Sequence, residues 1–165
     1  MYACTRSFSR SYNLQVIPAP KKRVLFVCIG NACRSQMAEA FARAYGSDML
    51  IAASAGVYPA ASVAPDTIRA MEEKNIDIRD HFPKSIKHLG RADFDIVVNM
   101  SGFFLPQTIG GRTIDWEVPD PVLMEYKEHC EIRDDIEQRV MKLVLELRSA
   151  PRTQFRGQGS GRLEP

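Results

Sequence analysis

The sequence predicts an α/β fold: a three-layer arrangement in which a four-stranded parallel sheet carries helices on both faces. Two observations support this prediction. Short apolar runs alternate with helical segments along the 165-residue chain, an order typical of parallel sheets with crossover helices. The last helical segment also has an apolar stripe that must pack on the sheet. Its residues are Ile132, Ile136, Val140, Leu143, Val144 and Leu147.

The individual elements follow from local patterns. Residues 24–27 are apolar throughout, which is typical of a buried parallel strand. Pro65 suits the first turn of a helix, and Asn75 suits its exit. The expected strands are 23–28, 50–54, 94–99 and 113–116, and the expected helices are 35–46, 65–75 and about 124–148.

One short segment supplies both a nucleophile and an anion site. Cys28 stands at the carboxyl end of the first strand, where open α/β sheets bind ligands. Gly30 and Asn31 tolerate positive φ, so the loop can turn successive N–H groups inward as an anion-binding nest. Ser35 is the predicted N-cap of the next helix, whose amino terminus directs positive partial charge into the loop.

Arg34 supplies a positive charge that complements the negative charge of an oxyanion. It follows Cys28 by six residues, so the loop can bring its guanidinium to the same centre, where the planar fork matches two oxygens of a phosphate. Helix amino termini and nearby cations favour the thiolate form of cysteine, which is the form that attacks. The segment therefore predicts phosphoryl-transfer chemistry at Cys28, which depends mainly on positioning and charge.

Residues 28–35 in this setting resemble the phosphate-binding loop of the low-molecular-weight protein tyrosine phosphatases, whose fold also carries thiol-linked arsenate reductases. The resemblance continues through Ser54-Ala55-Gly56, residues 65–78 and residues 115–121, and covers about residues 22–148. It implies the phosphotyrosine phosphatase I-like fold with strand order 2-1-3-4, and chemistry that requires no metal or organic cofactor.

The resemblance also implies the roles of individual residues. Cys28 is the nucleophile, Arg34 holds the oxyanion, and Asp120 of the pair Asp120-Pro121 is the general acid. Asn31 and Ser35 keep the loop and the thiolate in place. The implied phosphate-binding residues are Ile29, Gly30, Asn31, Ala32, Cys33, Arg34 and Ser35, with Ser54 in support.

Two interpretations remain open for Cys33, and two for Ser54. In many phosphatases of the family, a cysteine at the position of Cys33 forms a reversible disulfide with the nucleophile; the alternative is a small residue packed under the loop. Ser54 joins the loop's polar network in the family, or is a plain turn residue. Cys130 in the last helix and Cys4 near the amino terminus receive no catalytic role.

Two departures from the family bear on the reaction. Residues 36–39 look more like arsenate reductases, which usually carry further cysteines after the third strand. Residues 99–106 contain no cysteine, so a disulfide relay through this segment is impossible, whereas reduction by an external thiol acting on Cys28 remains open because it needs only that cysteine. Val122 and Leu123 stand where many phosphatases have tyrosines. The candidates for an aromatic rim are Tyr58, Phe103, Phe104 and Tyr126.

The sequence thus predicts a cysteine-dependent phosphatase that hydrolyses phosphomonoesters, above all protein phosphotyrosine, through a phosphocysteine intermediate. The alternative is an arsenate reductase that uses an external thiol. The intact set of Cys28, Arg34 and Asp120 argues against a phosphate sensor without turnover. The expected ligands are a phosphorylated protein or small phosphomonoester, and inorganic phosphate or arsenate.

Composition narrows the remaining possibilities. Residues 21–148 are expected to form one domain, residues 1–20 a flexible basic extension with some character of an organelle-targeting segment, and residues 149–165 a disordered tail.

Residues 21–150 hold 17 basic and 19 acidic side chains, which argues against nucleic-acid binding. No apolar stretch suits a membrane span, and a thiolate enzyme suits the cytoplasm. No metal site is expected, because the histidines lack ligand spacing and are expected at the surface: His81, His88 and His129.

Overall fold

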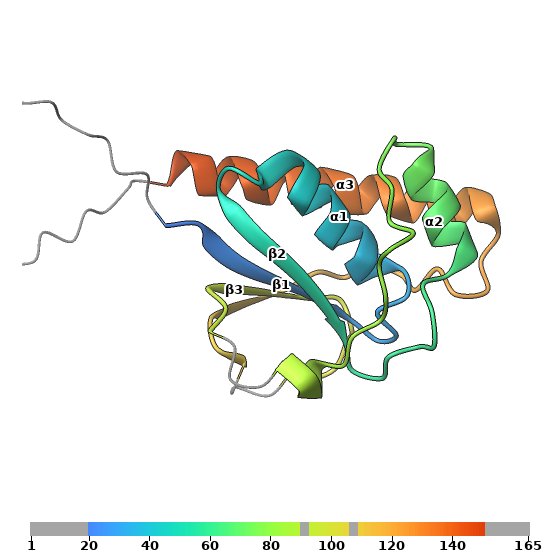
Figure 1. Ribbon diagram of the computed structural model, residues 1–165, viewed down its shortest axis with the longest axis horizontal. Helices are drawn as coiled ribbons and strands as arrows, with labels where there is room; N and C mark the ends of the chain where they lie inside the picture. Colours follow the sequence, from blue (N-terminus) through green and yellow to red (C-terminus); the bar gives the residue numbers. More distant parts are fainter. Residues whose placement is uncertain (1–19, 90–92, 106–108, 151–165) are drawn as a thin grey trace, which may run out of the picture.

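The computed structural model describes residues 20–89, 93–105 and 109–150, and its centre is one parallel sheet (Figure 1). The strands are β1 (Lys22–Cys28), β2 (Leu50–Gly56), β3 (Ile96–Asn99) and β4 (Arg112–Asp115), in the order β2-β1-β3-β4. The predicted four-stranded sheet and its order are confirmed. Because strand order reverses beside β1, the carboxyl end of β1 lies at the place where such sheets bind ligands.

Helices cover both faces of the sheet, as predicted. On one face lie α1 (Arg34–Gly46) and α3 (Tyr126–Ser149), with α2 (Pro65–Glu72) packed against α3. The opposite face carries a short 3-10 helix, η1 (Ile86–Leu89), which the sequence patterns did not predict. Pro65 occupies the first turn of α2, as expected.

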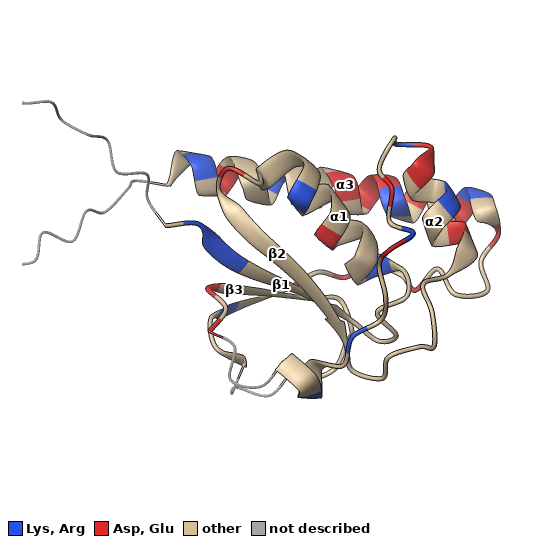
Figure 2. Cartoon of the chain, viewed as in Figure 1, with Lys and Arg blue, Asp and Glu red and all other residues tan. Residues whose placement is uncertain are grey.

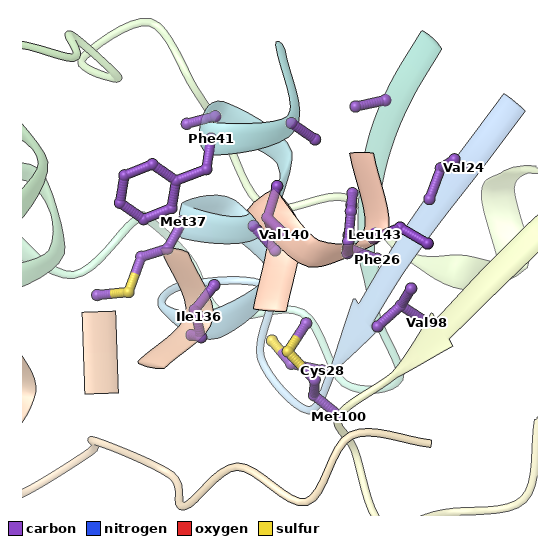
Figure 3. Packing of buried hydrophobic residues seen from close by; sticks show 14 of the residues in the cluster. Val24, Phe26, Cys28, Met37, Phe41, Val98, Met100, Ile136, Val140 and Leu143 are labelled. Atoms are coloured by element: carbon purple, nitrogen blue, oxygen red, sulfur yellow. The ribbon is translucent and has the colours of Figure 1, made fainter. Parts of the chain in front are cut away.

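The side chains of β1 alternate between two hydrophobic clusters. Leu25 and Val27 belong to the cluster on the η1 face. Val24, Phe26 and Cys28 belong to the larger cluster under α1 and α3 (Figure 3). Figure 3 also shows the helix residues that pack there, namely Met37, Phe41, Ile136, Val140 and Leu143. This alternation places the Cys28 side chain on the helix-covered face, next to the amino terminus of α1.

Some element boundaries differ from the sequence predictions. Helix α1 begins at Arg34 after Cys33, so the prediction of Ser35 as N-cap is wrong; the Ser35 hydroxyl instead contacts Cys28. Helix α2 ends at Glu72 rather than at residue 75, because the chain turns there and Asn75 adopts a left-handed φ of 58°. Strand β2 runs on to residue 56, and β3 starts two residues later than expected.

The two predicted tails lie almost entirely outside the described residues. The expected basic extension covers residues 1–20, of which only residue 20 is described. In the expected carboxyl-terminal tail, Ser149 still belongs to α3, so that boundary was placed too early. Residues 151–165 lie outside the described part of the chain.

Charges of both signs alternate over α2 and α3 (Figure 2). Lys74 contacts Glu137 at 2.6 Å and Asp134 at 2.9 Å, and Arg133 contacts Glu73 at 2.9 Å. These cations are paired with acids across the α2–α3 junction. In the part of the chain that the structure describes, no helix is both long and apolar enough to cross a membrane.

Two of the three histidines are not surface residues, so the prediction fails for them. His129 is 3% exposed, and its Nε2 lies 3.1 Å from the Thr67 hydroxyl across the α2–α3 contact. His81 is half-buried, with Nδ1 2.9 Å from the Gln36 side-chain oxygen. Only His88 is exposed. Both inward histidines bridge two elements, which a local sequence pattern cannot reveal.

The burial of His129 predicts a pH dependence of stability. Burial lowers the pKa of His129 below the usual 6.5, so the folded state resists protonation that the unfolded chain accepts. Stability is therefore full above about pH 6.5 and declines as the pH falls below it. Urea unfolding at about pH 7.5 and pH 5.5 should show this loss, and His129→Gln should reduce it while keeping a bond to Thr67. Because burial also lowers the pKa of His81, part of the slope should remain. Identical slopes in both proteins would contradict the assignment.

Candidate active site

The sulfur of Cys28 lies buried at the end of β1 and is held by two hydrogen-bonding groups. The Ser35 hydroxyl lies 2.9 Å from Sγ, and the backbone N–H of Asn31 donates to Sγ at 3.2 Å. Cys28 is 2% exposed. The Asn31 N–H is a donor in this arrangement, and the Ser35 hydroxyl can donate or accept, so both groups can hydrogen-bond to a sulfur that acts as a nucleophile.

Asn31 gives the loop its shape. It adopts a φ of 49°, whereas Gly30, the other residue expected to tolerate positive φ, does not use that freedom. The Asn31 amide nitrogen donates to the hydroxyls of Ser35 and Ser54, each at 2.8 Å. Its amide oxygen accepts the backbone N–H of Lys84 at 2.7 Å. Ser54 is therefore part of the loop's polar network, and its interpretation as a plain turn residue does not describe its surroundings.

The loop that follows β2 holds the outer side of the Cys28 loop. The backbone N–H groups of Tyr58, Ala60 and Ala64 donate to the carbonyls of Ile29, Gly30 and Ala32, at 2.9, 2.8 and 3.1 Å respectively. A planar trans peptide directs its N–H opposite to its carbonyl. With these carbonyls bound outside, the intervening amides turn toward the loop interior, as an anion-binding nest requires.

Gly56 permits this close approach. A Cβ at residue 56 would lie 2.8 Å from the Ile29 carbonyl oxygen and 2.9 Å from the Asn31 nitrogen. Both neighbours are backbone atoms, so neither can move aside cheaply. The end of β2 therefore carries glycine because the catalytic loop passes directly over it.

Arg34 is anchored from behind. Its Nη1 donates to the carbonyls of Met100 at 2.9 Å and Val118 at 3.0 Å, which follow β3 and β4. Its Nη2 contacts the Asp120 carboxylate. The Nε–H is buried and has no hydrogen-bond partner among the described residues. A buried donor of this kind needs an acceptor, and an oxyanion oxygen fits that requirement.

The structure brings Asp120 to the same centre. Its carboxylate is partly exposed and lies against Arg34, although 86 residues separate the two in sequence. The backbone N–H of Val122 donates to its other oxygen at 3.3 Å. All three predicted catalytic residues, Cys28, Arg34 and Asp120, therefore converge at one edge of the sheet. Among the described residues, no cluster of three His, Cys, Asp or Glu side chains could hold a metal ion.

A cleft of about 990 Å³ opens beside Arg34, between the segments that follow β3 and β4. Phe103 and Phe104 line it, and Tyr58 meets the Phe103 ring edge-on at 6.1 Å. These three aromatics fit the expected rim. Tyr126 does not: its hydroxyl donates to Glu73 at 2.6 Å, between α2 and α3.

The remaining cysteines differ from Cys28. Cys33 is buried directly before α1, and burial raises the pKa of its thiol to about 11, so it is protonated at neutral pH. Cys130 lies on α3 with its sulfur 3.9 Å from a Glu73 oxygen. All three described cysteines are free thiols. Cys4 lies outside the described residues.

A layer of polar residues lies behind the loop and was not predicted from the sequence. The buried Glu39 carboxylate accepts the Ser54 hydroxyl, and Gln36 donates to the Asn31 carbonyl at 2.9 Å. The backbone of Lys84 bonds both to Asn31 and to Gly56. The four-residue spacing of Ser35 and Glu39 on one helix face could have indicated Glu39. Nothing local points to Lys84, which is 53 residues from Asn31.

Comparison with known proteins decides the family. A model of the low molecular weight phosphotyrosine protein phosphatases matches residues 23–153. The chain belongs to this family. The resemblance read from the Cys28 loop is thereby confirmed.

The chain's relatives in this family include both arsenate reductases and phosphatases. A glutaredoxin arsenate reductase from Synechocystis is 32% identical over 130 residues, which is 76% of this chain and 98% of that protein. An arsenate reductase structure in its phosphate-binding state, also 32% identical, superposes with a TM-score of 0.71 over 76% of this chain and 98% of its own. A low molecular weight protein tyrosine phosphatase from T. tengcongensis is 25% identical, with a TM-score of 0.66 over 76% and 99% of the two chains.

Proposed function

We propose that this family member reduces arsenate at Cys28 and takes its reducing equivalents from a thiol outside the chain. This reverses the order of the sequence-based interpretations, in which phosphomonoester hydrolysis came first. The similarity to arsenate reductases supports the change. The proposal of an external thiol is supported by the distribution of cysteines: none of the described residues that line the cleft beside Arg34 is a cysteine.

The first step forms a bond between sulfur and arsenic. Arsenate has the shape and charge of phosphate, so the inward amides and the Arg34 Nε–H can hold its oxygens. The Cys28 thiolate attacks arsenic and an arsenate oxygen leaves as water. Asp120, against Arg34, is placed to supply the proton for that oxygen. The product is a Cys28 thioester of arsenic(V).

The second step is the reduction. A thiolate attacks the Cys28 sulfur, a sulfur–sulfur bond forms, and the sulfur–arsenic pair of electrons stays with arsenic. Arsenic(V) becomes arsenic(III) and leaves as arsenite, while the two sulfurs are oxidised to a mixed disulfide. A second thiol then releases Cys28. Such a cycle needs a reducing compartment, and we place it in the cytoplasm.

Among the residues that the structure describes, the other two thiols, Cys33 and Cys130, are poor candidates for the second step. The high pKa of Cys33 leaves little thiolate at neutral pH. Cys130 faces Glu73 at the α2–α3 junction instead of the cleft. The cleft beside Arg34 offers an external thiol room to approach. Cys33 as redox partner of Cys28 is therefore not part of the proposed cycle.

Arsenite production should depend on Cys28 and on an added thiol, but not on Cys33. The purified protein is incubated with arsenate and either glutathione with glutaredoxin, mycothiol, or thioredoxin, and arsenite is measured. Cys28→Ser should abolish turnover, whereas Cys33→Ser should keep it within about twofold, because a protonated Cys33 contributes little nucleophile. A folded Cys33→Ser variant without turnover would contradict the external attack. No arsenite with any thiol would contradict the reductase.

A second candidate function is phosphomonoester hydrolysis, favoured by the contact between Asp120 and Arg34. The same loop holds a phosphate, Cys28 attacks phosphorus, and Asp120 protonates the leaving oxygen and then activates water. The substrate would be a phosphorylated protein or a small phosphomonoester.

Any phosphatase activity should depend on Asp120 most strongly when the leaving group is poor. Asp120→Asn should lower kcat on phenyl phosphate about 10²- to 10⁴-fold and affect p-nitrophenyl phosphate less. Glu117→Gln is the matched control, because Glu117 lines the neighbouring cleft without touching Arg34. Unchanged rates of Asp120→Asn on phenyl phosphate would remove Asp120 as the acid.

A further inference from the structure

We propose that Lys84 and Glu39 are positioning residues for Cys28: their partly buried ion pair sets the direction of a hydrogen-bond chain that ends on the nucleophilic sulfur. The chain runs from Glu39 through Ser54, Asn31 and Ser35 to Cys28. The proposal rests on the nucleophilic role of Cys28 in the proposed function. It gives a positioning role to Lys84, which is distant in sequence from the Cys28 loop.

The direction of the chain follows from what each group can donate. An ionised carboxylate only accepts, so the Ser54 hydroxyl donates its hydrogen to Glu39. The lone pairs of Ser54 then accept from the Asn31 amide nitrogen. The amide orientation of Asn31 is fixed at the other end, because its oxygen accepts the Lys84 backbone N–H.

The last link follows in the same way. The second amide hydrogen of Asn31 goes to the Ser35 hydroxyl at 2.8 Å. Ser35 accepts there, so its own hydrogen remains free to point at the Cys28 sulfur, 2.9 Å away. A donor and an acceptor are thus assigned at each link of the chain, and the final donor, the Ser35 hydroxyl, lies against the Cys28 sulfur. A protonated Glu39 could instead donate to Ser54, and the order would be lost.

Glu39 is 1% exposed, and a carboxylate removed from water is stabilised by neighbouring cations. Two reach it: Arg43, whose side chain is 56% exposed, and Lys84, whose Nζ lies 3.5 Å from Oε2 with 26% exposure. Half-buried His81 also faces this region from the segment before Lys84, and its pKa is lowered by burial. Lys84 is the more shielded cation, and a shielded charge is screened less by water and salt.

The position of Lys84 is fixed by contacts of its backbone and of its side chain. Its backbone carbonyl accepts the Gly56 N–H at 2.8 Å, and its Nζ donates to the Phe82 carbonyl at 3.2 Å and lies 5.1 Å from the Phe82 ring centroid. Lys84 therefore contacts the polar chain at two points, with its backbone on Asn31 in the middle and its side chain on Glu39 at one end.

The test is the reactivity of Cys28 toward iodoacetamide at about pH 6.5 and pH 9.5, read by mass spectrometry of the Cys28 peptide without added oxyanion. Lys84→Met should slow the reaction about tenfold at pH 6.5 and less than about twofold at pH 9.5, because a hydrogen bond to a charged sulfur is weakened. Lys84→Arg should restore the rate. Lys87→Met, an exposed lysine on η1, should match the wild type.

A double variant distinguishes an effect transmitted through the hydrogen-bond chain from a direct, through-space effect of the Lys84 charge. Cys28, Arg34 and Asp120 all lie near the Cys33 thiol, and a Lys84 substitution leaves Arg34, Asp120 and Cys33 in place. If Lys84 acts through Ser54, then Lys84→Met should have no further effect in a Ser54→Ala background. Additive losses would mean a through-space charge effect and overturn the proposal. Equal slowing at both pH values, or none at pH 6.5, would also overturn it.

Failure of this inference can be told apart from failure of the proposed function. If Lys84→Met leaves Cys28 reactivity unchanged while the wild type still makes arsenite, only the positioning role falls. If the wild-type Cys28 is no more reactive at about pH 6.5 than Cys130 in the same digest, the nucleophile itself is misassigned. Circular dichroism melts of each variant confirm that the compared proteins are folded.

Discussion

The structure depends on a loop closed around one sulfur. Residues 29–35 bend so that the Asn31 N–H and the Ser35 hydroxyl both reach Cys28, and the outward carbonyls are bound by the segment after β2. This geometry requires a left-handed Asn31, a glycine at residue 56 and a helix that starts at Arg34. Each of these is a local feature, but none would hold without the sheet beneath.

The sheet brings the parts together because its strands are parallel. Parallel strands end at one edge, so β1 delivers Cys28, β2 delivers Gly56, and the segments after β3 and β4 deliver the two carbonyls that anchor Arg34. The same segments form the cleft beside Arg34 and bring Asp120 against it. The fold therefore couples the oxyanion loop to a route by which a second reactant can approach, and the identity of that reactant separates a reductase from a phosphatase.

Much of this was predictable from the sequence, for physical reasons that differ between residues. The Cys28 loop is contiguous and its strand and helix are marked by apolar periodicity, so the sheet and the place of Cys28 and Arg34 at its edge could be predicted. Asp120 came from family resemblance, because an Asp-Pro pair alone indicates only a turn. Ser35 was misplaced as N-cap, since a cap and a partner for sulfur look alike in sequence. Lys84 and His129 act across long sequence separations, and only the folded chain reveals their contacts.

The central claim is that the amides of residues 29–35 and Arg34 form a preformed site for a tetrahedral oxyanion. The most direct measurement is a titration of the nitrogen-15-labelled Cys28→Ser variant with phosphate and with arsenate, followed by amide NMR shifts. The account predicts saturable shifts of the loop amides and of the Arg34 Nε–H, with the same residues responding to both anions. Shifts confined to other surfaces, or none in the loop at saturating anion, would contradict it.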